Sequence, residues 1–194
     1  LVQNGGTLTI TNGKLTKSGD SDNADNCNFY GTNSALLAVG EKSKAIISDS
    51  SIDATSSGSN AIFSTDSASV LANNVNITTS AANSRGLDAT YGGSIIANAM
   101  TISTKGDHSA SLATDRGGGS VSVTDSTLNT AGSGSPLLYS TGDIEVSGVT
   151  GTASGSQIAG MEGLNTILIN NSTLESTNTG TTGSDPVANG VIIY

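Results

Sequence analysis

The chain has 194 residues and a formal net charge of -9, with 7 Lys+Arg against 16 Asp+Glu. Phosphate backbones are bound by clustered cations, so this balance argues against nucleic acid as a partner. No apolar stretch approaches the roughly 20 residues that span a bilayer, and the single cysteine excludes an intramolecular disulfide bond.

Short strands with alternating side chains follow one another from the start of the chain, as in Thr7-Leu8-Thr9-Ile10 and Ser120-Val121-Ser122-Val123. Leu, Ile and Val are expected to point inward, and Thr and Ser outward. The opening residues Leu1-Val2-Gln3-Asn4 resemble the middle of a repeat. We therefore expect the chain to be a segment of a longer repeat protein, folded as one domain over residues 1–194.

Three apolar columns share a period of about 25 residues. The first column is Leu8, Ala45, Val70, Ile95, Val121, Ile144 and Ile167. The second is Leu15, Ile52, Ile77, Ile102, Leu128 and Leu174, with Val149 as its weak member. The third is a small residue followed by an apolar pair, including Ala35-Leu36-Leu37, Ala61-Ile62-Phe63, Gly86-Leu87-Asp88, Ala110-Ser111-Leu112 and Pro136-Leu137-Leu138.

Three short strands per repeat predict an all-β fold: a right-handed, single-stranded parallel β-helix with three parallel sheets and about seven rungs. Neighbouring rungs would lie about 4.8 Å apart, so that equivalent side chains stack. The solvent-exposed ends of such a coil predict a monomer with some end-to-end association.

Two insertions interrupt the period, at residues 18–33 and 176–185, and insertions in solenoids commonly lie on the binding face. The first carries Asp20, Asp22 and Asp25, whose carboxylates are candidate ligands for calcium, although the bidentate Glu and fixed Gly of an EF-hand are missing. The alternative is a solvated, flexible loop. Cys27 in the same loop is expected to be an incidental thiol and not a reactive one, although an exposed cysteine could dimerise the isolated chain in air.

The strings Ser84-Arg85-Gly86-Leu87-Asp88-Ala89-Thr90-Tyr91-Gly92-Gly93 and Ala113-Thr114-Asp115-Arg116-Gly117-Gly118-Gly119 are similar to motifs in large repeat-bearing surface proteins of bacteria. The whole pattern resembles the pectin-lyase-like right-handed β-helix superfamily. This resemblance implies an extracellular or cell-surface location, but the catalytic motifs of the polygalacturonase-like enzymes are absent from the sequence.

Six polar residues occupy matching parts of two successive repeats and are the candidate ligand-binding patch: Arg85, Asp88, Tyr91, His108, Asp115 and Arg116. An Arg can clamp a carboxylate in two-pronged fashion. Asp88 stands where Leu37, Phe63, Leu112 and Leu138 are expected in other repeats. The alternative is structural, with Asp88 and Arg116, or Arg85 and Asp115, pairing between rungs.

We therefore expect a non-catalytic, adhesin-like extracellular module that binds a glycan or matrix ligand or acts as a rigid spacer. One alternative is a polysaccharide lyase or hydrolase using Asp88, His108, Asp115 and Arg116, although general acid and base catalysis needs two poised groups. A minor alternative is an ice-binding solenoid, because Thr flanks the second apolar column. No cofactor other than calcium is expected.

Overall fold

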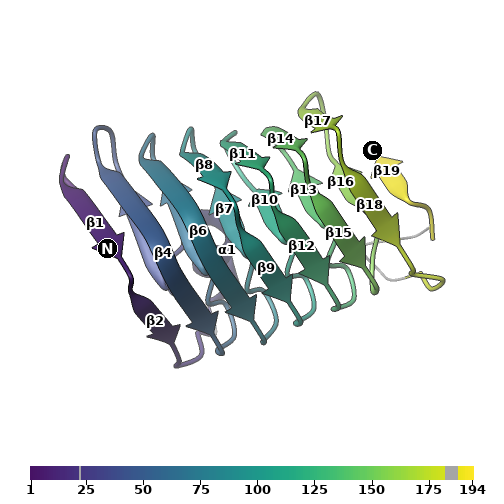
Figure 1. Ribbon diagram of the computed structural model, residues 1–194, viewed down its shortest axis with the longest axis horizontal. Coiled ribbons are helices and arrows are strands. Elements are labelled where there is room, and N and C mark those ends of the chain that lie inside the picture. Colours follow the sequence, from purple (N-terminus) through teal and green to yellow (C-terminus); the bar gives the residue numbers. More distant parts are fainter. Residues whose placement is uncertain (22, 182–187) are drawn as a thin grey trace.

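The structure, a computed structural model, describes residues 1–21, 23–181 and 188–194. It is an all-β parallel β-solenoid of about six turns, which confirms the predicted β-helix class (Figure 1). The sequence predicted about seven rungs. The smaller of its sheets has seven strands, and seven stacked strands enclose six turns.

The strands form one sheet of 12 strands and one of 7. The first arm of the larger sheet contains β1 (Thr7–Thr11), β4 (Lys44–Ala54), β6 (Ser69–Thr79), β8 (Ser94–Asn98), β11 (Ser120–Thr124), β14 (Asp143–Ser147) and β17 (Thr166–Asn170). The second arm adds β2 (Lys14–Lys17), β9 (Thr101–Thr104), β12 (Thr127–Thr130), β15 (Thr150–Ala153) and β18 (Thr173–Ser176). The smaller sheet consists of β3 (Leu36–Val39), β5 (Ile62–Thr65), β7 (Leu87–Ala89), β10 (Leu112–Thr114), β13 (Leu138–Ser140), β16 (Ala159–Met161) and β19 (Val191–Ile193).

The predicted three strand ladders are present, and two of them are joined. β4 and β6 each run for 11 residues through the corner between the two arms, whereas later turns divide there into two strands. All the ladders between named strands are parallel, so each turn adds one strand to each face of the coil (Figure 1).

The strand register confirms the first apolar column in full, from Leu8 opposite Ala45 to Ile144 opposite Ile167. The second column is confirmed except in its sixth member. Gly151, not Val149, pairs with Leu128 and Leu174. Val149 lies two residues before Gly151, at the corner between the two arms, and is fully buried there. The side chain of Leu137 fills the core next to Gly151, where other turns have Leu or Ile.

The third column was misaligned by one residue in its later turns. Leu112 pairs with Leu87 on one side and with Leu138 on the other, and all three point into the core. The outward neighbours of Asp88 are Phe63 and Ala113, and Tyr139 follows Ala113. The small-apolar-apolar pattern does not distinguish the two registers, because Ser111 and Leu137 occupy the place of the small residue.

The corner between the two arms of the larger sheet repeats a left-handed backbone conformation in every turn. The residues there have φ between 45° and 68°: Asn12, Asp49, Asn74, Ala99, Asp125, Gly148 and Asn171. Asn, Asp and Gly adopt this conformation more readily than other residues do. The corner therefore explains the spacing of these residues along the sequence, and Ala99 is its poorest fit.

A buried serine ladder closes the turn that precedes the smaller sheet. The backbone N–H of Ser59 donates to Ser84 Oγ, that of Ser84 to Ser109 Oγ, and that of Ser109 to Ser135 Oγ, at 2.9 to 3.1 Å. Each bond joins one turn of the coil to the next. These serines satisfy polar backbone groups that the narrow interior hides from water.

The first insertion is an ordered helical segment, where a solvated loop was one expectation. It contains α1 (Ala24–Tyr30), capped at its start by Asn23 Oδ1, which accepts from the N–H of Asn26, and at its end by Gly31 in the left-handed conformation. Cys27 is completely buried, so the condition for dimerisation through this thiol, its exposure, is not met. The buried side chain of Cys27 packs α1 against the coil, which favours an ordered helix over a loop.

α1 is fastened to the outer side of the smaller sheet (Figure 1). The side-chain amide of Asn60 donates to the carbonyl of Cys27 at 2.9 Å, and the hydroxyl of Thr90 donates to the carbonyl of Phe29 at 2.8 Å. A Cβ on Gly31 would lie 2.4 Å from the ring of Phe63. The segment thus covers the outward column at Phe63 and Asp88, both of which are 0% exposed.

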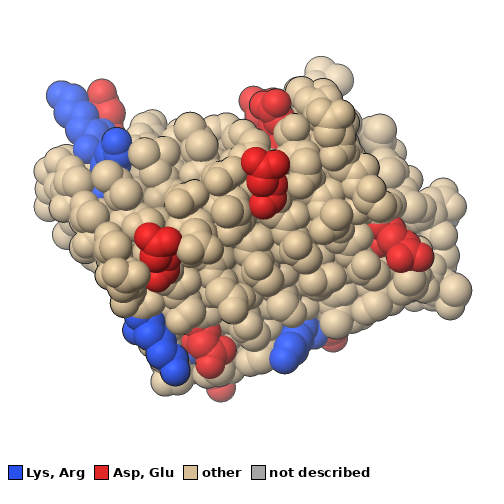
Figure 2. Space-filling model, in the orientation of Figure 1, with Lys and Arg blue, Asp and Glu red and all other residues tan. Residues whose placement is uncertain are grey.

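The second predicted insertion, 176–185, begins at the last residue of β18, and its part from 182 onward lies outside the described residues. Within the described ranges no helix is both long and apolar enough to cross a membrane. The face of the larger sheet carries few charged side chains (Figure 2). Its outward Thr ladder is in register over Thr101, Thr127, Thr150 and Thr173.

Candidate functional site

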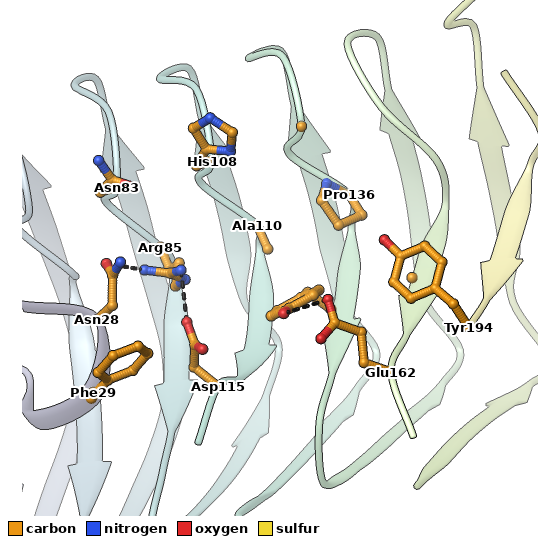
Figure 3. Close-up of a pocket in the computed structure, with 13 residues that line it drawn as sticks. Asn28, Phe29, Asn83, Arg85, His108, Ala110, Asp115, Pro136, Glu162 and Tyr194 are labelled. Atoms are coloured by element: carbon orange, nitrogen blue, oxygen red, sulfur yellow. Dashed lines mark hydrogen bonds and ion pairs between the residues drawn. The ribbon is translucent and has the colours of Figure 1, made fainter. Parts of the chain in front are cut away.

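A groove of about 480 Å³ lies on the outer side of the smaller sheet, directly beside α1 (Figure 3). Asn28 and Phe29 of α1 form one end, and Glu162 and Tyr194 lie toward the other. A neighbouring hollow of about 390 Å³ shares Phe29, Asp115, Tyr139 and Glu162 with it. The first insertion thus builds a wall of the groove, as insertions on a binding face commonly do.

All six aromatic residues of the chain lie on this side of the coil, although aromatic residues make up only 3% of the sequence. Phe29, Tyr139 and Tyr194 line the groove. Phe63 is covered by the end of α1, and the ring of Tyr30 stacks on that of Tyr91 with centroids 5.5 Å apart. Aromatic side chains are gathered where the outer surface is hollowed, and the aliphatic core contains none.

Arg85 is the polar centre of the site, and its side chain is fully committed to protein partners. Nη1 donates to Asn28 Oδ1 at 2.5 Å, and Nη2 donates to Asp115 Oδ2 at 2.8 Å. Nε lies 3.6 Å from Oδ2 of Asp88. Because Arg85 is only 7% exposed, the guanidinium ties α1 to two turns of the coil (Figure 3).

Of the two expected structural pairs, one forms. Arg85 and Asp115 pair between turns, as that interpretation predicted. Asp88 pairs with Arg85 and not with Arg116, whose guanidinium carbon lies 3.8 Å from the ring centroid of Phe29. The reason is the position of α1, which places Phe29 beneath Arg116 as a cation–π partner.

The environment of Asp88 favours its neutral form. Burial, with a contribution from Asp115, raises the pKa of this carboxyl to about 8, and Arg85 offsets only part of the effect. Neither carboxyl oxygen of Asp88 has a hydrogen-bond partner among the described residues. Burial also raises the pKa of Asp115, with Arg85 opposing it. Burial therefore favours the protonated form of both carboxyls, and Asp88 is the more deeply buried of the two.

Tyr139 and Glu162 form the second polar feature of the groove. The hydroxyl of Tyr139 donates to Glu162 Oε1 at 3.0 Å. Burial raises the pKa of Tyr139 above its usual range, and the charges of Asp115 and Glu162 add to the effect. Tyr139 therefore keeps its proton and presents a half-buried ring.

Of the remaining predicted residues, only His108 lines the groove itself. His108 is exposed and lines it with Asn83, and both have φ near 52°, the left-handed conformation that Gly58 and Gly134 adopt in the neighbouring turns. Tyr91 stacks on Tyr30 above the turn that follows β7, and Arg116 lines the neighbouring hollow. Of the six predicted residues, Arg85, His108 and Asp115 line the groove and Arg116 lines the neighbouring hollow, whereas Asp88 is buried and Tyr91 lines neither. Their role in binding stays a prediction.

Sequence reasoning missed Asn28, Phe29, Asn83, Tyr139, Glu162 and Tyr194. Correct alternation within the strand after Ser111 would have placed Tyr139 in the outward column of Asp88. The scarcity of aromatic residues was the other usable signal, since every one of them belongs to this side. Phe29 could not be placed, because its position depends on how the insertion folds.

The predicted calcium ligands do not form a cluster in the described part of the chain. Among those residues no three His, Cys, Asp or Glu side chains lie together as a metal site would need. Asp20 Oδ1 accepts from the N–H of Ser57 at 2.8 Å, and Asp25 is in the first turn of α1. Asp22 lies outside the described residues.

Comparison with known proteins gives no match: no family model, no curated protein and no solved structure aligns significantly with the chain.

Proposed function

We propose that this chain is a non-catalytic module that binds a glycan in the groove beside α1. The observation that carries the proposal is the gathering of all six aromatic residues on the grooved side, three of them in the groove itself. Aromatic rings offer apolar faces to the C–H faces of sugar rings, and amide and carboxylate groups bond to hydroxyls. Asn28, Asn83, Asp115 and Glu162 supply such polar groups around the rings.

The dimensions of the groove suit an extended oligomer. Apart from Asn28 and Phe29 of α1, its lining residues come from the turns of β7, β10, β13, β16 and β19, and four steps of about 4.8 Å span roughly 19 Å. Binding sites are typically hollows with apolar walls and a few placed polar groups. A short stretch of polysaccharide laid across the strands would contact several turns at once.

The engagement of the charged groups supports binding over catalysis. General acid and base catalysis needs two titratable groups poised at the substrate. Asp88 is buried and does not line the groove, Asp115 is bonded to Arg85, and Glu162 accepts from Tyr139. Burial accounts for the raised pKa values of Asp88 and Asp115, and structural ion-pair networks also contain such shifted groups.

The wider setting that we propose is a bacterial cell surface, with the solenoid as an adhesin-like, rigid module related to the pectin-lyase-like β-helices. The support is the solenoid itself, the net charge of -9 and the similarity of the Arg85 and Asp115 strings to surface-protein motifs. If no glycan binds, the rigid-spacer role is the one that the fold still supports.

The test is titration of the purified chain with a panel of oligosaccharides, followed by nuclear magnetic resonance or calorimetry. We expect binding by at least one neutral oligosaccharide, lost in Tyr139→Ala and unchanged in Ile96→Ala, which alters an exposed side chain on the other sheet. Equal melting temperatures of the two variants would exclude misfolding. Binding unaffected by Tyr139→Ala would contradict the proposed site, and release of shortened or unsaturated products would establish an enzyme instead.

A further inference from the structure

The charges of the groove are arranged to oppose a negatively charged ligand. Its lining contains one guanidinium, of Arg85, and two carboxylates, of Asp115 and Glu162, which leaves a net charge of -1. Among the described residues, no other Lys, Arg, Asp or Glu side chain lines the groove. The neighbouring hollow repeats the balance, with Arg116 against Asp115 and Glu162.

Arg85 is not available as an anion clamp. The three donor groups of Arg85 face Asn28, Asp115 and Asp88, and the side chain is nearly buried. Turning the Arg85 side chain toward a ligand would leave the Asp115 carboxylate without its partner. The free energy lost in this way exceeds the free energy that an ion pair with a ligand at the surface would contribute. Arg116 lies over Phe29, where its charge faces an aromatic ring.

Glu162 is the carboxylate that a ligand would meet first. Its side chain is exposed, and its Oε1 atom accepts a hydrogen bond from the hydroxyl of Tyr139. The negative charge of Glu162 is therefore held beside the ring of Tyr139, which a bound sugar would cover. Asp115, by contrast, is largely neutralised by Arg85. A uronate or sulfate group seated on Tyr139 would therefore lie next to an uncompensated negative charge.

We infer that the groove selects uncharged glycans and rejects anionic ones, and that Glu162 is the residue that determines this specificity. The inference rests on the proposed glycan-binding function. It replaces the expectation that an arginine clamps an acidic sugar. Discrimination by an unfavourable contact is a common way to obtain specificity without strengthening the preferred contacts.

Matched ligand pairs test the inference, because the members of each pair share one sugar backbone and differ at a single group, which is neutral in one and charged in the other. The probes are fully methyl-esterified oligogalacturonides against their free acids, and cello-oligosaccharides against the same oligomers oxidised to uronates at C6. We expect the neutral member of a bound pair to bind at least about threefold more tightly at low salt, with the difference shrinking at about 0.5 M salt. Glu162→Gln, which keeps an acceptor for Tyr139, should remove most of the preference.

The outcomes separate this inference from the function that it rests on. If the free acid of a bound pair is preferred, or if Glu162→Gln leaves the preference unchanged, the specificity inference is wrong and the glycan groove stands. If no member of any pair and no other oligosaccharide binds, the proposed function itself fails. Asp143→Asn, an exposed carboxylate on β14 of the other sheet, is the control for a general effect of net charge.

Discussion

The Nε atom of Arg85 lies 3.6 Å from Oδ2 of Asp88, and both side chains are enclosed between α1 and the smaller sheet. Removing a carboxylate from water favours its protonated form, and the raised pKa of about 8 for Asp88 reflects this burial. A single buried acid thereby makes the stability of the coil depend on pH.

Stability should fall as the pH rises from about 4 to about 8. In this range the unfolded chain, in which Asp88 has its ordinary pKa of 3.8, has released a proton that the folded chain still holds. The stabilising contribution is complete below pH 4 and is lost through pH 8, with a slope of at most about 1.4 kcal/mol per pH unit. Chemical denaturation at several pH values measures it. Asp88→Asn should flatten the profile, and Asp143→Asn should not; a flat profile in the unmodified protein would contradict the buried acid.

Ala99→Asn should stabilise the protein by about 0.5 to 1 kcal/mol. Ala99 has φ of 54° at a corner where Asn74, Asp125 and Asn171 stand in other turns. A side chain that tolerates the left-handed conformation removes strain of about 1 to 2 kcal/mol, part of which Asn itself retains. Ala99→Val is the opposite control and should lower the melting temperature. A melting temperature that falls in Ala99→Asn would show that the corner is not strained.

Ser109→Ala should destabilise the coil by about 1 to 3 kcal/mol. The change removes the acceptor of the buried Ser84 N–H, at 3.0 Å, and leaves that donor without a partner. Ser103→Ala, on the outward side of β9, loses no such bond and should stay within about 0.5 kcal/mol. Equal losses in the two variants, measured by urea denaturation, would refute the ladder as a stabilising feature.

Gly31→Ala should release α1 from the sheet at a cost of about 2 to 4 kcal/mol. The new Cβ would clash with Phe63 at 2.4 Å, and Ala disfavours the φ of 63° at this position. Hydrogen exchange should show α1 opening while strands β11 to β15 stay protected. Gly180→Ala, which has no close backbone contact, should change neither quantity.

How far the sequence predicts this molecule depends on whether periodicity alone decides a position. Two of the apolar columns follow directly from the spacing of residues such as Val70 and Ile77, because stacked turns place them over one another. The third column was misaligned from Ser111 onward, because the pattern aligned Ala110 with Gly86, whereas the strand register aligns Ser111 with Gly86. Register errors of one residue exchange the two faces of a strand, and this one hid Tyr139.

The candidate site divides in the same way. Arg85 and Asp115 were found because their strings repeat in successive turns, and stacking brings the two side chains to 2.8 Å. Asn28 and Phe29 lie 57 residues or more from their partners and belong to a segment with no repeat, so no periodic argument could reach them. Their contacts are set by the capped helix and by the apolar side that it presents to the coil.

The attachment of α1 also makes the rod mechanically uneven along its axis. Through Asn60, Thr90 and Arg85, the helix couples the turns of β5 and β7 to the loop after β10. From β13 onward, the strands that the structure describes pair only with strands of the adjacent turns, as is usual in solenoids. Under stretching from its two ends, the coil should fray turn by turn from the C-terminal side, and the segment around α1 should resist longest.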